Sequence, residues 1–232
     1  MNTLSIQERE HILRLLGDGM SIRSIAALTG VSKNTVAKLL IDAGYACAKY
    51  HDANVRGVRT GRADVTDIWS FAHAKHETGA AAKTGHYSAN DAWLRVISES
   101  GSNLIVSYRI GAHDAESAGS LMSDFETRLA DPVNLKDVLV NFVEGPNLSL
   151  ETPTRDVTQS ADDFKRRVQN HASAVAFHIV CHNFVGNGEA GSPTPAMTAG
   201  ISDRPLEFIE IATLVAQSIG TRSKQISYKK SL

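Results

Sequence analysis

The chain has 232 residues, of which 42% are hydrophobic and 21% are charged, and its formal net charge is −1. This composition is typical of a folded protein with one large or two small domains, and it excludes a disordered chain. No apolar run approaches the roughly 18 residues that cross a bilayer, and MNTLSIQERE shows no secretory signal, so we expect a cytoplasmic protein without a membrane partner.

The charge is unevenly distributed along the chain. Residues 1–62 contain nine Lys and Arg against five Asp and Glu, whereas residues 63–232 contain 15 against 20. A basic first part followed by an acidic remainder indicates that the first part meets a polyanion.

Residues 1–46 predict three short helices. The first runs from about residue 6 to residue 16, Ser21 caps the second, and Ser32 caps a third that is expected to end at Gly44. Serine is a preferred cap because its hydroxyl accepts a hydrogen bond from a free N–H of the first turn. A tight turn at Gly30 separates the second helix from the third, which is the pattern of a helix-turn-helix.

The third helix is predicted to read the major groove of double-stranded DNA. Its first exposed positions carry side chains that can reach base edges and phosphates, and the start of the second helix suits a phosphate contact. The candidate DNA-binding residues of the helices are Ser21, Arg23, Ser32, Lys33, Asn34, Thr35 and Lys38. A small helical interaction domain without nucleic acid is the alternative.

Residues 47–62 are interpreted as a basic linker that follows the DNA backbone or enters a minor groove. Its candidate DNA-binding residues are Lys49, Arg56, Arg59 and Arg62.

Residues 63–220 predict a second domain that contains both strands and helices. Strands are expected at 65–74, 91–100, 103–112 and 133–143, the second and third as a hairpin, and helices at 115–130, 161–184 and 205–219. This order predicts an α+β or α/β fold with a mixed sheet and flanking helices, which is a truncated RNase H-like fold. Residues 221–232 are interpreted as a basic tail.

The chain resembles transposases of bacterial insertion sequences, which carry a helix-turn-helix and a DDE catalytic domain of RNase H-like fold. The stretches that carry the resemblance are SIRSIAALTGVSKNTVAKLL (21–40), IWSF (68–71), LIVSYRIG (104–111), NFVEGPNL (141–148), FKRRVQNHASAVAFH (164–178), HNFV (182–185) and TPAM (194–197). They follow the family order over nearly the whole chain.

The resemblance implies three carboxylates that hold two divalent metal ions. In this chain Thr66 stands in the place of the first carboxylate, and the stretch that would carry the second is missing. Glu144 matches the third, but Pro146 follows where the family has an arginine-rich helix, and Gly186 replaces an arginine near the C-terminal end. We therefore expect no catalysis and no metal or other cofactor, with Thr66 and Glu144 as relic positions.

Other metal-ligand candidates are few. The free cysteines Cys47 and Cys181 lie far apart, and His171, His178 and His182 are interpreted as core or interface residues.

A rearranged site is the alternative to the loss of catalysis. Asp64, Asp137 and Glu144 are its candidate ligands, whereas Asp67 is expected to face the opposite side of its strand from Thr66.

The sequence therefore predicts a sequence-specific DNA-binding protein derived from a transposase. We expect a transcriptional regulator that acts as a homodimer or higher homo-oligomer and lacks transposition chemistry. A metal-dependent nuclease, a non-catalytic inhibitor or partner of an intact transposase, and a decayed gene product stay open as alternatives.

Overall fold

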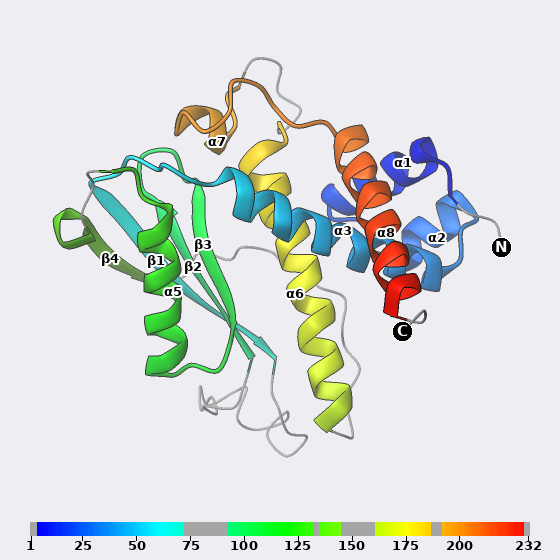
Figure 1. The fold of residues 1–232 in the computed structure, drawn as a ribbon, viewed down its shortest axis with the longest axis horizontal. Coiled ribbons are helices and arrows are strands. Elements are labelled where there is room, and N and C mark those ends of the chain that lie inside the picture. The colour runs from blue at the N-terminus through cyan, green and yellow to red at the C-terminus, as the bar shows by residue number, and fades with distance from the viewer. Residues whose placement is uncertain (1–3, 72–91, 132–134, 145–160, 187–191, 230–232) are drawn as a thin grey trace.

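The computed structural model describes residues 4–71, 92–131, 135–144, 161–186 and 192–229. Its elements are α1 (Ile6–Gly17), α2 (Ile22–Thr29), α3 (Lys33–Asn54), β1 (Arg62–Phe71), β2 (Ala92–Glu99), β3 (Ile105–Gly111), α5 (Ala115–Arg128), the short 3-10 helix η2 (Leu135–Asp137), β4 (Leu139–Glu144), α6 (Ala161–Phe184), α7 (Pro195–Thr198) and α8 (Phe208–Lys229) (Figure 1). The fold is α+β, as predicted.

The described strands form one mixed sheet in the order β3-β2-β1-β4. β2 is antiparallel to both β1 and β3, and β4 runs parallel to β1. The predicted hairpin of the second and third strands is therefore confirmed. The predicted fourth strand begins too early, because residues 135–137 form η2 before β4 starts.

Helices cover both faces of the sheet. Leu94 and Val96 lie on the face that packs against Val175 and Ile179 of α6. The other face meets α5, where the Ser107 hydroxyl of β3 donates to the Asp124 carboxylate. Side chains alternate along each strand, so apolar residues at both sets of positions give the sheet two buried faces.

The helix-turn-helix and the sheet share one hydrophobic core. Ile12, Ile25 and Val36 of the first three helices belong to the same buried cluster as Ile97 of β2 and Phe177 of α6. α8 packs against α1 and α3 and so ties the last part of the chain to the first. It extends to Lys229, and therefore includes most of the segment predicted as a tail.

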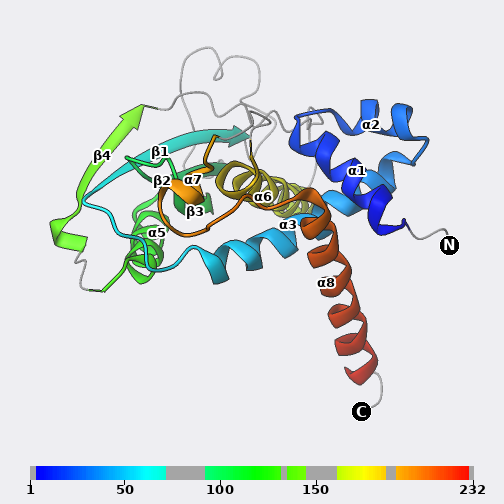
Figure 2. The same cartoon turned by 90° about the horizontal axis from the view of Figure 1, so that it is seen from above.

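The prediction that Gly44 ends the third helix is wrong. α3 continues to Asn54, so residues 47–54 of the predicted linker are helical (Figure 2). Gly44 instead lies at the crossing of α3 and α6, where a Cβ atom would come within 2.1 Å of the Ser173 carbonyl oxygen. Glycine is required here because the two backbones touch.

The far end of α3 is anchored to β3. The buried His51 donates from Nε2 to the carbonyl oxygen of Ile105 at 3.0 Å. Asn183 of α6 binds the same residue twice, because its Oδ1 accepts the Ile105 N–H at 2.9 Å and its Nδ2 donates to the Ile105 carbonyl at 2.8 Å. β3 is an edge strand, so α3 and α6 satisfy backbone groups that a further strand would otherwise bind.

The Gly44 contact predicts a specific loss of stability. We expect Gly44→Ala to lower the free energy of unfolding by about 3 kcal/mol, because the clash is with backbone that cannot rotate away. Gly119→Ala in α5, where the new Cβ meets nothing within 4 Å, should instead raise it by roughly 0.5–1 kcal/mol through helix propensity. Denaturant unfolding of both variants measures the difference, and a stabilised Gly44→Ala protein would contradict the crossing.

Burial of His51 predicts a dependence of stability on pH. Desolvation lowers the pKa of His51 from 6.5 to about 4, so the unfolded chain binds a proton in this interval that the folded chain does not. The contribution of His51 to the free energy of unfolding should be fully present above about pH 6.5. It should be lost as the pH falls towards 4, which lowers the free energy of unfolding by up to about 3 kcal/mol. Burial lowers the pKa of His171 to about 4 as well, which adds in the same direction.

Denaturant unfolding at several pH values measures this dependence. His51→Gln keeps an N–H donor without a titrating ring, and its stability should change less between pH 6.5 and 4 than that of the wild type. The exposed His11 provides the matched variant, His11→Gln, for the same substitution outside the core. Equal slopes in the wild type and His51→Gln would contradict the assignment.

Candidate nucleic-acid interface

The turn between α2 and α3 has the local structure that the sequence predicts. Ser21 caps α2 by accepting the Ser24 N–H at 3.1 Å. Gly30 ends α2 with φ of 71° and donates its N–H to the Ala26 carbonyl at 3.1 Å. That left-handed conformation is one that glycine adopts without steric cost.

Ser32 positions the start of α3. Its hydroxyl accepts the Thr35 N–H at 3.2 Å and lies 2.9 Å from the Thr35 hydroxyl. Ser21 and Ser32 are thus helix caps, as predicted. Of the candidate DNA-binding residues, these two and Thr35 have side chains already engaged in local hydrogen bonds.

Three polar side chains near the Ser32 cap and the Gly30 turn project into solvent. Lys33 and Asn34 are exposed in the first turn of α3, and Arg23 is exposed in the first turn of α2. None of the three forms a side-chain hydrogen bond or ion pair with another residue that the structure describes. Beneath them Ile25 and Val36 are fully buried, which fixes the two helices against each other.

Further along α3 and just past its end, exposed cations have partners four residues away. Lys38 forms an ion pair with Asp42, and Arg56 forms one with Asp52. The Lys49 ammonium lies 4.5 Å from the centroid of the Tyr45 ring. Such pairs along one helix face contribute roughly 0.2–0.5 kcal/mol each to the helix.

Lys49 lies on α3 itself, but the structure does not bring Arg56, Arg59 and Arg62 close to Lys33 and Asn34 at the start of that helix. α3 has 22 residues, which corresponds to a length of about 33 Å at ~1.5 Å per residue, and Arg56 lies beyond its end. Arg56 also donates to Thr127 of α5, whereas Arg59 and Arg62 are exposed near the start of β1 (Figure 1). Their closeness in the sequence predicts one continuous basic arm. That prediction is wrong because α3 continues to Asn54 and so separates these cations from the start of the helix.

The aspartates of β1, which contains the IWSF stretch, form hydrogen bonds with neighbouring strands. Asp67 receives a bidentate pair of hydrogen bonds from Arg95 on β2 and a contact from His113 at 2.8 Å. Although burial opposes it, bonding to Arg95 and His113 holds the pKa of Asp67 below its usual value. Thr66 is half-buried and pairs with Val96 of β2 and Val143 of β4.

Asp64 lies on the same face as Thr66 and is bound by β4. The Asn141 amide donates to Asp64 Oδ1 at 3.0 Å, and this bond holds the pKa of the Asp64 carboxyl below its usual value. Asn141 was not identified from the sequence, because its contact with Asp64 depends on the parallel pairing of β1 with β4.

Glu144 is the last residue of β4, and its Cα is paired with that of Asp67. The sequence match assigns Glu144 to the third carboxylate of the family. The structure places it at the end of β4, the strand beside β1.

The three candidate histidines lie along α6. His182 bonds through Nε2 to the Asn103 carbonyl at 3.0 Å, and burial lowers the pKa of both His171 and His178. Cys47 and Cys181 are free thiols whose pKa values burial raises. Within the described ranges, no group of three or more His, Cys, Asp or Glu is arranged to hold a metal ion.

Comparison with known proteins identifies the first part of the chain. A family model described as a helix-turn-helix domain matches residues 2–40. Neither the curated proteins nor the solved structures gave a match. None of the described helices is long and apolar enough to span a membrane. The chain therefore contains a helix-turn-helix at residues 2–40, a domain type that commonly binds DNA.

Proposed function

We propose that the protein is a sequence-specific double-stranded DNA-binding protein, derived from an insertion-sequence transposase, that regulates transcription as an oligomer without transposition chemistry. The observation that carries this proposal is the start of α3, where the exposed Lys33 and Asn34 follow the Ser32 cap and the Gly30 turn. The helix-turn-helix match over residues 2–40 supports the same function.

The chemistry of these side chains suits base and phosphate contacts. With the N-terminus of α3 in the major groove, Asn34 can bind adenine through two hydrogen bonds, and Lys33 can bind guanine or a phosphate. Arg23 and the free N–H groups of the first turn of α2 suit the phosphate backbone, which positions the protein without specifying sequence.

The rigid attachment of the helix-turn-helix favours paired binding sites. α3 is continuous from Lys33 to its anchor at His51. The orientation of the reading helix is therefore fixed relative to the sheet, and two associated copies would present two readers at a fixed spacing. A single reader makes few base contacts, so a pair of half-sites about 34 Å apart would supply the missing specificity.

The arrangement of the acids argues against metal-dependent cleavage. Asp67 accepts two hydrogen bonds from the Arg95 guanidinium, so its charge is already matched by a fixed cation. Asp137 precedes β4 and Glu144 ends it, and the strand between them is about 17 Å long at ~3.3 Å per residue. This placement does not suit two carboxylates that would share ions roughly 3.5–4 Å apart in a two-metal site.

DNA binding is tested by selection from random double-stranded DNA, followed by gel shifts with the selected sequence. We expect Asn34→Ala to weaken binding to that sequence by at least about tenfold and to relax the preference at one base pair, because a bidentate base contact contributes about 1–3 kcal/mol. Lys33→Ala should weaken binding and reduce its dependence on salt concentration.

Lys136→Ala is the matched control for the loss of one positive charge. Lys136 is exposed in η2, which precedes β4 at the opposite end of the molecule from the helix-turn-helix (Figure 1). Its removal should leave the affinity unchanged. The proposal fails if no sequence is enriched, or if the Lys33 and Asn34 variants bind the enriched sequence as tightly as the wild type.

The loss of catalysis is tested on the DNA that the protein binds. With Mg²⁺ or Mn²⁺ present, we expect no nicking or strand transfer above the buffer background, because the place of the first carboxylate holds Thr66 and Asp67 is bound by Arg95. Cleavage that disappears in Glu144→Gln but persists in Glu126→Gln, a change of an exposed glutamate on α5, would instead show a working rearranged site.

A further inference from the structure

A cavity of about 380 Å³ opens between α3, β3 and α5. α3 contributes Ala48 and His51 to its wall, β3 contributes Tyr108 and Arg109, and α5 contributes Leu121 and Arg128. Small-molecule sites have volumes of roughly 300–1,000 Å³. This cavity lies at the lower end of that range, which suits a compound with a single ring.

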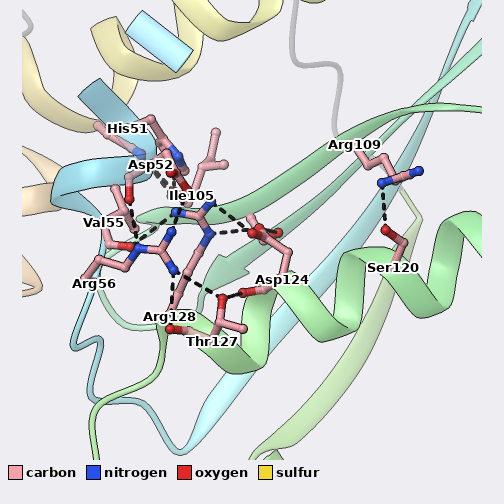
Figure 3. Close-up of polar contacts among 12 residues, drawn as sticks. His51, Asp52, Val55, Arg56, Ile105, Arg109, Ser120, Asp124, Thr127 and Arg128 are labelled. Carbon is pink, nitrogen blue, oxygen red and sulfur yellow. Dashed lines mark hydrogen bonds and ion pairs between the residues drawn. The ribbon is translucent and has the colours of Figure 1, made fainter. Parts of the chain in front are cut away.

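The charge of Arg128 is already matched inside the protein. Its Nε and Nη2 donate to the two oxygens of Asp124 at 2.8 and 3.0 Å, and Nη2 also donates to Asp52 at 2.9 Å (Figure 3). Its Nη1 donates to the Val55 carbonyl. Arg128 therefore holds α5 against the end of α3 and has little capacity for a ligand.

Arg109 has the capacity that Arg128 lacks. It is exposed, and its one side-chain hydrogen bond to a described residue runs from Nη1 to the Ser120 hydroxyl at 2.7 Å. Figure 3 shows its guanidinium apart from the Arg128 group, above α5. Asp124 is paired with Arg128, and the guanidinium N–H groups of Arg109 that do not bind Ser120 can donate to a carboxylate.

The rest of the wall suits an aromatic ring. The Tyr108 and His51 rings meet edge to face with centroids 5.3 Å apart. His51 and Leu121 are buried behind the wall, whereas Tyr108 and Ala48 are half-buried and present the aromatic and aliphatic surface that a ligand ring can contact. Burial raises the pKa of Tyr108 to about 12, so its phenol stays a hydrogen-bond donor at neutral pH.

We propose that this cavity binds a small aromatic carboxylate, with the carboxylate on the Arg109 guanidinium and the ring against Tyr108 and Ala48. The same cavity has α3 as a wall, and α3 begins with the reading residues Lys33 and Asn34. Occupancy is therefore coupled to the position of the reading helix, and this second statement rests on the proposed DNA-binding function.

Benzoate is the probe, and benzamide is the matched uncharged probe. Calorimetry on the full chain without DNA should show saturable benzoate binding, and the amide resonances of Ala48, Arg109 and Leu121 should shift. Benzamide should bind at least about tenfold more weakly, because it cannot form the charge-assisted hydrogen bonds of the carboxylate. Arg109→Gln should weaken benzoate binding to the benzamide level. Arg9→Gln removes an arginine of α1 and should bind as the wild type does.

Ala48→Phe provides a second, independent variant, since it fills the cavity and leaves every charge in place. It should abolish benzoate binding while retaining the wild-type circular dichroism spectrum. No saturable binding, or binding that is unchanged in both folded Arg109→Gln and Ala48→Phe, overturns the site.

The coupling is measured separately, as the affinity for the selected DNA with and without saturating benzoate. A change in DNA affinity on adding benzoate, absent in Ala48→Phe, supports the coupling. If benzoate binds but the DNA affinity does not change, the coupling is overturned and the benzoate site stands. If the protein binds no DNA even without benzoate, the proposed DNA-binding function fails instead.

Discussion

The crossing of α3 over α6 at Gly44 is the contact on which the rest of the structure depends. The two backbones approach too closely for any side chain on Gly44, with the Ser173 carbonyl 2.1 Å from the place of a Cβ atom. Because α3 passes this point without ending, one helix carries the candidate DNA-binding residues Lys33 and Asn34 at its start and the sheet anchor at its end. The helix-turn-helix is consequently part of the main core and not a domain on a flexible linker.

This construction explains how the acidic, sheet-containing part of the chain can serve a DNA-binding protein. Its strands and helices hold α3 in place through His51, Asn183 and the Arg128 ion pairs. Two acids of β1 also join strands, because Asp67 binds Arg95 of β2 and Asp64 binds Asn141 of β4. The sheet and its helices thus act as a scaffold for α3.

Local sequence signals were sufficient to predict much of the fold. The caps at Ser21 and Ser32 and the turn at Gly30 act through neighbours within a few residues, and the bounds of α6 and the β2–β3 hairpin follow from periodicity and turn composition. The exposure of Lys33 and Asn34 could be predicted for the same reason.

The errors arise where a distant contact overrides a local signal. Glycine ends many helices, but Gly44 continues one because α6 lies against it. The bonds of Asn183 to Ile105 join residues 78 positions apart. The pairing of Asn141 with Asp64 likewise needs the register of β4 on β1. A single sequence contains no signal for such pairs, so the anchor of α3 and the cavity beside it could not have been predicted.

The most direct test of the account is a genome-wide map of the DNA that the protein occupies in its own cells, compared with the map for Asn34→Ala. The account predicts a few sharp sites in promoter regions, each with two related half-sites, that are lost in the variant. Sites at the ends of repeated mobile elements, or a map that does not change in the variant, would contradict it.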